Sequence, residues 1–448
     1  MKRTIPLIAA TAMAWAVSLG LSADQAMEAD PAKARAAAPG APTFTKDVAP
    51  ILYKNCVGCH RPGEIAPMSL LTYADARPWA KAIRDEVGDG NMPPWHADPQ
   101  FLKLRDERRL TDADKSTLVR WANTGALEGD PKALPPVPSF TDGWRMGKPD
   151  QIFEMQEDYA VPAEGTIEYE WFYIPTNFTD PKYIQQIEIR PGNKTVVHHV
   201  LVYYRAKPDK QRTPVLQPNQ AQMKTPERRV NGTRPPKGPE LGPRRLIASF
   251  APGIDPQAFP AGTALRLEAG GTIELQMHYT TNGTPGTDRT RIGVIYAKEE
   301  PKHEIRASAF FNGTLVLPAG ADDVKVDADL TFVQDAIVWG ILPHTHLRGK
   351  KWEYRLEAPD GTARTILAVP KYDFNWQTYY MFEEPLKVAK GSKLTSTAWY
   401  DNSPKNKFNP DPKVQVLWGD QTWEEMQYTG ILFSPAEATP ATTAQAKP

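Results

Sequence analysis

A C-x-x-C-H motif at residues 56–60 places two thiols beside one imidazole, and Cys56 and Cys59 are the only cysteines of the 448 residues. Two thiols at this spacing can add to the two vinyl groups of a haem, while His60 binds the iron. A zinc site would need further ligands, and no other cysteine exists to supply them. A thioredoxin-type redox pair would need a βαβ context, whereas helical signals flank this motif. The motif therefore predicts one covalently attached haem c.

The second axial ligand of that iron is expected to be a methionine on a loop. Met92 is the best candidate, because the two prolines that follow it would hold its loop rigidly. Met68 and His96 are the alternatives. Ligation by one histidine and one methionine gives a relatively high reduction potential, which suits the transfer of single electrons.

Short helical patterns surround the haem motif. Apolar residues recur at helical spacing over 47–52 and 75–87, and a T-x-x-D start signal at Thr111 opens a further helix towards Gly125. These flanks resemble a small class I cytochrome c. The resemblance implies a small all-α cytochrome c domain over residues 43–130, followed by a Pro-rich linker over 131–145.

Five of the eight histidines lie in or next to apparent strands later in the chain, namely His198, His199, His278, His344 and His346. Two adjacent histidines in a regular strand point to opposite faces, so the strand must bulge or end if both are to reach one ion. The H-x-H spacing of His344 and His346 puts both rings on the same face of a strand. A single buried histidine in a strand is usually a core residue, but five in three segments are harder to explain in that way. Imidazole suits copper, zinc and non-haem iron.

These histidine motifs, with G-D-Q-T-W-E-E-M at residues 419–426, resemble the copper type II, ascorbate-dependent monooxygenases. That family includes dopamine β-hydroxylase and peptidylglycine α-hydroxylating monooxygenase. The order of the motifs is the same, from HH through HY and HTH to EM, and the resemblance covers roughly residues 150–435. It implies two all-β, jelly-roll-like sandwich domains, over residues 146–300 and 301–436, each of which holds one copper.

The resemblance also implies the ligands of the two coppers. His198, His199 and His278 would bind a copper that stores electrons. His344, His346 and Met426 would bind the copper that activates O2 and would form the catalytic set. A thioether in place of a third imidazole favours Cu(I). The alternative for Met426 is a core methionine.

The family reaction inserts one oxygen atom of O2 into a C–H bond, releases the other as water and consumes two electrons. Because a haem shares this chain, we expect the fused cytochrome to supply those electrons at a high effective concentration. The expected function is that of an exported haem- and copper-dependent monooxygenase of a small organic substrate, served by an electron donor to the haem. The alternatives are an electron-transfer or copper-binding protein without hydroxylase activity, and a binding module with zinc or no metal.

Three departures from the family pattern qualify this expectation. The chain has no cysteine pair left for disulfides in its β-rich part. Leu342 stands where peptide-hydroxylating members have an arginine, which disfavours a peptidylglycine substrate. The stretch 205–245 is basic and Pro-rich and looks like an insertion, which could serve as a lid, a docking surface or a solvated loop.

The amino-acid composition disfavours or excludes several other classes of protein. Lys and Arg total 53 and Asp and Glu total 53, so a nucleic-acid binder that works through bulk positive charge is disfavoured. With 41% hydrophobic and 24% charged residues, a multi-span membrane protein and full-length disorder are excluded. Residues 1–23 read as a signal peptide for the periplasm, with membrane contact only if it is uncleaved. Residues 24–42 are expected to form a flexible linker, and residues 437–448 a tail.

Overall fold

The computed structural model describes residues 40–64, 66–140, 143–207, 214–225, 244–251 and 255–437. Residues from Ala41 onward belong to one compact unit. The predicted signal peptide, nearly all of the linker after it and most of the tail lie outside the described residues. Within the described ranges, no helix combines the length and the apolarity needed to cross a membrane.

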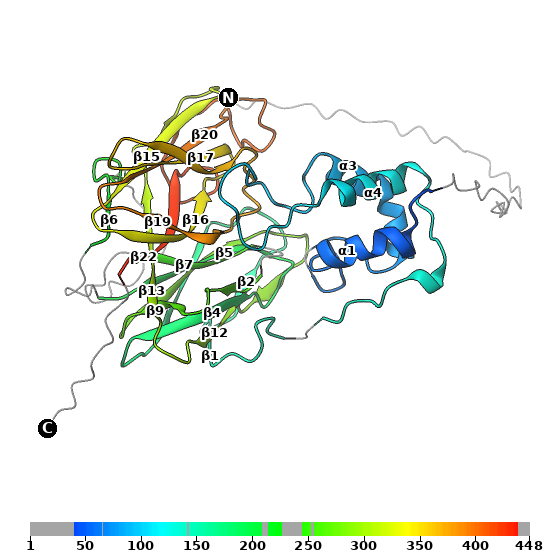
Figure 1. Ribbon diagram of the computed structural model, residues 1–448, viewed down its shortest axis with the longest axis horizontal. Helices are drawn as coiled ribbons and strands as arrows, with labels where there is room; N and C mark the ends of the chain where they lie inside the picture. The colour runs from blue at the N-terminus through cyan, green and yellow to red at the C-terminus, as the bar shows by residue number, and fades with distance from the viewer. Residues whose placement is uncertain are drawn as a thin grey trace, which may run out of the picture. The chain divides into compact units, whose positions relative to one another are not determined.

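The helices lie near the N-terminal end of the described chain (Figure 1) and are short. Thr111 accepts a hydrogen bond from the backbone N–H of Asp114 at 3.1 Å, so the predicted T-x-x-D start is confirmed. Phe44, Leu52 and Trp121 are buried in a small core between these helices. The elements are a π-helix η1 (Phe44–Val48), α1 (Ala49–Asn55), α2 (Tyr73–Ala76), the 3-10 helix η2 (Arg77–Trp79), α3 (Ala80–Gly88), α4 (Asp112–Asn123) and the 3-10 helix η3 (Pro131–Ala133).

Strands dominate the rest and hold 38% of the described residues. In chain order they are β1 (Gln151–Glu154), β2 (Tyr159–Val161), β3 (Glu170–Pro175), β4 (Lys182–Arg190), β5 (Val197–Arg205), β6 (Leu216–Pro218), β7 (Arg245–Phe250), β8 (Gln257–Ala258), β9 (Thr263–Leu267), β10 (Thr272–Tyr279), β11 (Gly286–Asp288), β12 (Arg291–Tyr296), β13 (His303–Phe311), β14 (Val316–Leu317), β15 (Val324–Phe332), β16 (Ala336–His344), β17 (Gly349–Glu357), β18 (Ala363–Val369), β19 (Tyr380–Val388), β20 (Lys393–Tyr400), β21 (Val416–Leu417) and β22 (Tyr428–Pro435).

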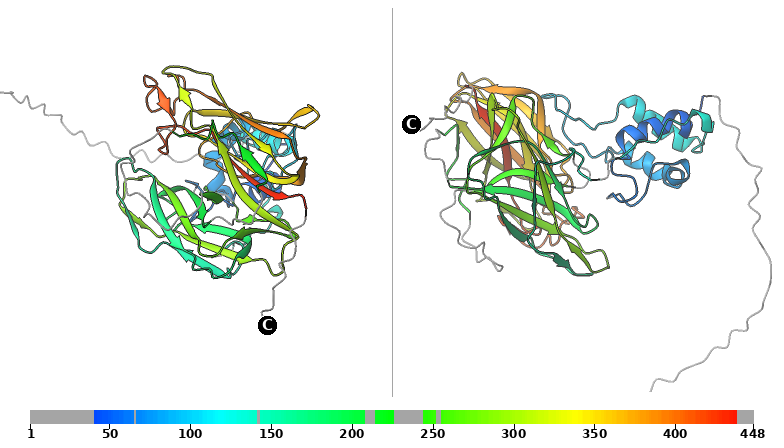
Figure 2. Two further views of the ribbon diagram at one scale, coloured as in Figure 1. Left: turned by 90° about the vertical axis from the view of Figure 1, so that its left-hand side faces the viewer. Right: turned by 90° about the horizontal axis from the view of Figure 1, so that it is seen from below.

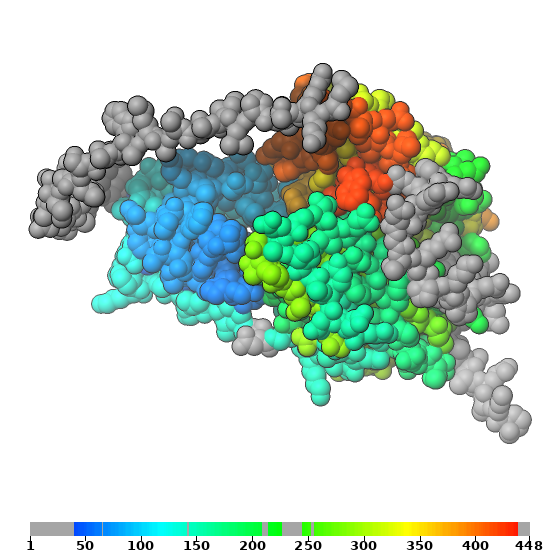
Figure 3. Space-filling model, turned by 180° about the vertical axis from the view of Figure 1, so that it is seen from behind, coloured from blue at the N-terminus to red at the C-terminus, as the bar shows by residue number. Residues whose placement is uncertain are grey.

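One nine-stranded sheet runs through both halves of the β-rich part, in the order β1-β12-β4-β9-β13-β22-β16-β19, with β8 paired to β4. A four-stranded sheet, β3-β10-β5-β7, shares one apolar core with it. A five-stranded sheet, β18-β17-β20-β15-β6, shares a second core with its other end. Figure 2 shows the green and the yellow-to-red strands in neighbouring layers, and Figure 3 shows the green residues as a continuous surface. Two-stranded pairs β11-β2 and β14-β21 complete the described sheets.

The predicted fold class is wrong. The chain is mostly β-sheet, and its few short helices do not make the small all-α cytochrome c domain that was expected before two all-β jelly-roll-like sandwich domains. The two β regions are also joined, because β13 pairs with β9 on one side and with β22 on the other. One sheet therefore continues across the expected boundary near residue 300.

The segment 95–109, between α3 and α4, pairs with strands of the β-rich part. Its backbone N–H groups at Asp98, Leu102 and Arg105 donate to carbonyls of β18 and β19 at 2.8–3.3 Å. Leu104 forms a β-bridge with Phe382 of β19. A segment without its own helix or sheet must find partners for its backbone groups, and here β18 and β19 supply them.

We predict that Leu432→Ala lowers the free energy of unfolding by about 2–5 kcal/mol. Leu432 is fully buried in β22, opposite Ala307 of β13 and Gly340 of β16, so its loss leaves a cavity in the shared sheet. Chemical denaturation of the full chain checks this, with the exposed Val316→Ala as the control, expected within about 0.5 kcal/mol of the wild type. A loss no larger than that of the control would contradict the shared core.

Candidate metal centres

The first cluster contains His198, His199 and His278 from the paired strands β5 and β10. His199 pairs directly with His278, whereas the next pair joins Val197 to Tyr279, so His198 is an extra residue in the ladder. The bulge expected from two adjacent histidines is therefore present. The bulge turns the side chains of His198 and His199 towards the ring of His278 on β10.

The ring nitrogens of this cluster converge. The Nδ1 atom of His199 lies 3.2 Å from Nδ1 of His198 and 3.3 Å from Nδ1 of His278. Candidate ligand atoms of all three residues lie within 4.8 Å of one another. Burial lowers the pKa of His278 to about 3, and it also lowers the pKa of the other two rings. The three imidazoles are thus neutral near pH 7, which is the form that binds a metal ion.

An amide fixes which nitrogen of His198 faces the cluster. The Nε2 atom of His198 lies 2.9 Å from Oδ1 of Asn375, and Nδ2 of Asn375 donates to Asp373 at 3.0 Å. Because the amide nitrogen is already engaged, its oxygen must accept the proton of Nε2. The lone pair of Nδ1 then points at the other two rings.

The second group is built where β16 ends. His344 is the last residue of β16 and lies opposite Tyr428 of β22, so the same antiparallel register brings position 346 towards position 426. The ring centroids of His344 and His346 are 5.2 Å apart, and both side chains are buried. The pairing of two strands therefore brings the H-T-H and E-M motifs together.

Hydrogen bonds also select the free nitrogens of this second group. Oε1 of Gln377 lies 2.5 Å from Nδ1 of His344, while Nε2 of Gln377 donates to the Phe374 carbonyl. Nδ1 of His346 lies 3.1 Å from the Glu424 carbonyl, and its Nε2 is buried without a partner among the described residues. Burial lowers the pKa of His344 to about 4. Both rings are neutral and offer Nε2 as the metal ligand.

Glu425 holds the second group together. Its buried carboxylate accepts hydrogen bonds from the backbone N–H groups of His346 at 2.8 Å, Arg348 at 2.7 Å and Met426 at 3.2 Å. Burial raises the pKa of Glu425 to about 7, although the three N–H donors oppose that change. The glutamate before Met426 therefore ties the two motifs together.

The two groups lie beside each other. The ring of Tyr169 is 5.0 Å from that of His278 and 6.4 Å from that of His346. The ring of Phe374 lies 5.5 Å from that of His199 and 6.1 Å from that of His346. Two aromatic rings thus separate the clusters while touching both.

A cavity of about 610 Å³ opens beside the second group and is lined by both His344 and Met426. Most of its wall is apolar or aromatic. The two arginines in the wall have carboxylate partners, because Arg244 pairs with Glu274 and Arg245 with Glu268. Further lining residues are Trp171, Tyr203, Phe311, Leu342, Trp418 and Tyr428.

The haem motif follows α1 as a tight turn, in which the N–H groups of Cys59 and His60 donate to the Cys56 carbonyl at 3.1 and 2.9 Å. Both thiols are free, and burial raises the pKa of Cys56 to about 12. Cys56, Cys59, His60 and Met92 line one cavity of about 310 Å³. The residues present therefore fit a covalent haem, which the two cysteines would attach and which His60 and Met92 would ligate.

The two alternatives for the axial ligand lie close to this cavity. Met68 packs against the core of the helical segment, and His96 is buried close to Asp373 and Lys371. Neither lines the cavity that contains the cysteines. The ligation by Met92 stays a prediction that this placement favours.

The basic stretch 205–245 is described only in part. Its residues 214–225 include β6, which pairs with β15, and Met223 lines the cavity beside His344. Arg205 lies 2.8 Å from the carboxylate of Glu274. The described part thus contributes to a sheet and to the cavity wall.

Sequence reasoning missed Asn375 and Gln377, which orient one histidine of each cluster, and Tyr169 and Phe374, which lie between the clusters. Asparagine and glutamine carry no sequence signal for such a role. The D-F-N-W-Q run at residues 373–377 offers only its density of polar and aromatic residues outside any strand.

No family model matches the chain. The solved structures that resemble it do so faintly. A putative secreted protein from Eubacterium rectale is 10% identical with a TM-score of 0.19, over 60% of this chain and 69% of that one. An allantoicase is 10% identical with a TM-score of 0.15, over 55% and 81%. The VP2 subviral particle of infectious bursal disease virus is 8% identical with a TM-score of 0.19, over 64% and 72%. Such scores carry no argument about fold or function, and they give the copper monooxygenase resemblance no support.

We predict that Glu425→Gln costs about 1–3 kcal/mol of stability and weakens metal binding at the His344 group. The new amide turns a donor towards backbone N–H groups that need an acceptor. Metal titration and thermal unfolding of the full chain check this. Glu424→Gln is the matched control, because the Glu424 carbonyl that faces His346 is unchanged. Equal effects of the two substitutions would contradict the role given to Glu425.

Proposed function

We propose that the protein is a copper-dependent monooxygenase that hydroxylates a C–H bond of a small, largely apolar organic molecule, with electrons supplied through a covalent haem. One oxygen atom of O2 enters the C–H bond, and the other leaves as water after two electrons and two protons are added. The donor that reduces the haem would be a one-electron carrier. Bound copper would supply one-electron redox chemistry and reactivity towards O2, and the haem would supply the electrons.

The observation that carries the proposal is the convergence of six separated residues into two groups that flank the same pair of aromatic rings. In the first group the Nδ1 atoms of three imidazoles converge, and the second has two imidazoles, of which His344 lines the same cavity as Met426. Neutral nitrogens and a thioether suit copper better than Mg2+ or Ca2+, which prefer oxygen ligands. A structural zinc site usually takes four protein ligands, which neither group provides.

Different residues of the chain would orient the metal ligands and bind the substrate. Asn375 and Gln377 hold the histidine rings in the orientation that binds metal, and Glu425 keeps Met426 beside the H-T-H turn. The aromatic wall around Trp171 and Phe311 would bind an apolar substrate next to His344. Since Arg244 and Arg245 are already paired with carboxylates, this wall favours a neutral molecule over an anion.

Metal content tests the proposal. The full chain, exported and haem-loaded, is expected to bind about two coppers, and His278→Ala and His344→Ala are each expected to lose about one. His303→Ala, in β13 outside both clusters, is the control and should keep both. A wild-type protein that binds zinc but no copper would overturn the proposal. Copper binding without O2 uptake across a panel of neutral aromatic and aliphatic compounds would favour the electron-transfer alternative.

Covalent haem attachment is tested separately. In the wild type, haem is expected to stay with the protein in acidified acetone, whereas Cys56→Ser/Cys59→Ser should release it. Met92→Leu should keep the covalent bond but lose the methionine-to-iron charge-transfer absorption. Met68→Leu is the control and should leave the spectrum unchanged. Loss of that absorption in Met68→Leu alone would contradict the assignment of Met92.

A further inference from the structure

One short segment, Tyr372–Gln377 between β18 and β19, contacts all three candidate cofactor sites. Tyr372 donates to the carbonyl of Thr345, in the centre of the H-T-H motif, at 3.0 Å. Gln377 holds His344, and Phe374 packs against rings of both clusters. The segment therefore fixes the two metal groups relative to each other.

Asn375 faces in two directions within this segment. It lines the cavity that contains Cys56, Cys59, His60 and Met92, and its Oδ1 lies 2.9 Å from Nε2 of His198. The wall between the predicted haem and the first ligand of the histidine cluster is thus one residue thick.

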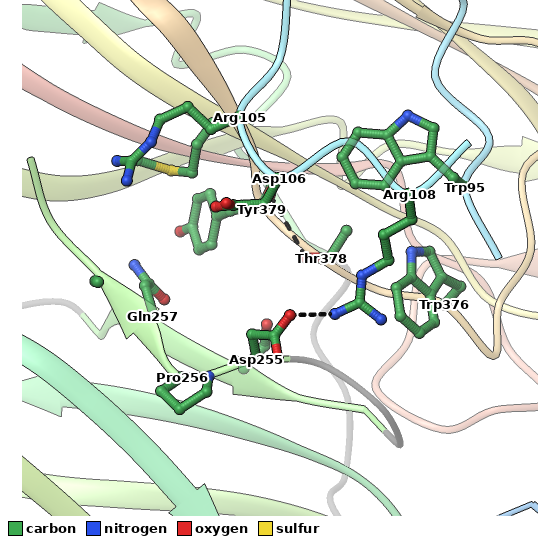
Figure 4. Close-up of a pocket in the computed structure, with 13 residues that line it drawn as sticks. Trp95, Arg105, Asp106, Arg108, Asp255, Pro256, Gln257, Trp376, Thr378 and Tyr379 are labelled. Atoms are coloured by element: carbon green, nitrogen blue, oxygen red, sulfur yellow. Dashed lines mark hydrogen bonds and ion pairs between the residues drawn. The ribbon is translucent and has the colours of Figure 1, made fainter. Parts of the chain in front are cut away.

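The surroundings hold Asn375 in place. Asp373 accepts hydrogen bonds from both the backbone N–H of Asn375 at 2.8 Å and its side-chain Nδ2 at 3.0 Å. The neighbouring Trp376 is buried and lines the same cavity. Figure 4 shows Arg108 beside the Trp376 ring, with its guanidinium 5.0 Å from the ring centroid and 2.7 Å from the carboxylate of Asp255.

We propose that Asn375 is a positioning residue that couples the haem cavity to the His198–His199–His278 cluster, both by fixing the tautomer of His198 and by bridging the two sites. The proposal rests on the function proposed above. A partner that hydrogen-bonds the second nitrogen of a ligating histidine sets its orientation and tunes its metal, and removing such a partner typically costs about 10–100-fold in affinity or activity. Here that partner is also the wall of a second redox site.

The test measures electron exchange in the absence of substrate and O2. Full-length protein with its haem reduced and no copper bound is mixed with Cu(II), and haem oxidation is followed optically. One electron leaves each ferrous haem and reduces one Cu(II) to Cu(I), with no bond broken and no proton moved. The Cu(II) form of the first cluster, prepared with oxidised haem, is examined by electron paramagnetic resonance.

Asn375→Leu is expected to slow haem oxidation at saturating copper by about 10-fold or more and to change the resonance spectrum of the first cluster. Asn375→Asp keeps an acceptor oxygen and should restore most of the rate. Because Asn375 is exposed, neither substitution disturbs buried packing. Thr378→Val is the control beside this segment, since Thr378 lies outside the haem cavity and its hydroxyl donates to the Tyr379 carbonyl at 3.5 Å. It should leave the rate unchanged.

The outcomes separate this inference from the proposed function. A wild-type protein that binds no copper, or whose haem is not oxidised by bound copper, would overturn the proposed function. Fast exchange in the wild type with the same rate and spectrum in Asn375→Leu would overturn the role of Asn375 alone. Equal slowing by Thr378→Val would also overturn it, because the effect would then belong to the whole loop between β18 and β19.

Discussion

Five imidazoles that are buried or half-buried in or beside a β-sheet core have to remain neutral, and the rest of the site depends on meeting that constraint. Burying a charged ring is costly, and burial lowers the pKa of all five. A neutral ring still has one N–H that needs an acceptor. Asn375, Gln377 and the Glu424 carbonyl each provide one and so decide which nitrogen stays free.

The shared sheet is the second determinant. Because β13 joins β9 to β22, residues near 200 and residues near 345 belong to one packed body, and Tyr169 and Phe374 can touch both clusters. Two independent sandwiches joined by a linker would leave such contacts to domain motion. In this chain, which lacks disulfides in its β-rich part, strand pairing and buried apolar area hold the sites at a fixed distance.

The segment 372–377 combines these effects. It lies outside any strand, yet most of its side chains are buried because each has a partner in a different part of the chain. Segments of this kind position functional groups through side-chain contacts rather than through backbone regularity. The importance of such a segment can be recognised only when the residues that it contacts are known. Asn375 is the example, because it contacts His198 and also lines the cavity near Cys56.

The sequence by itself determined the chemistry-bearing residues. The C-x-x-C-H spacing, the five clustered histidines and the need for a bulge at His198 follow from covalent geometry and strand periodicity, which act locally. It did not determine the fold class, because the pairing of β13 with β9 and with β22 joins segments far apart in the chain. Only the tertiary structure decided that Met426 and His344 line one cavity, that Glu425 ties the two motifs and that Asn375 and Gln377 orient the rings. Those contacts depend on strand register and on residues far apart in the chain, which no local pattern encodes.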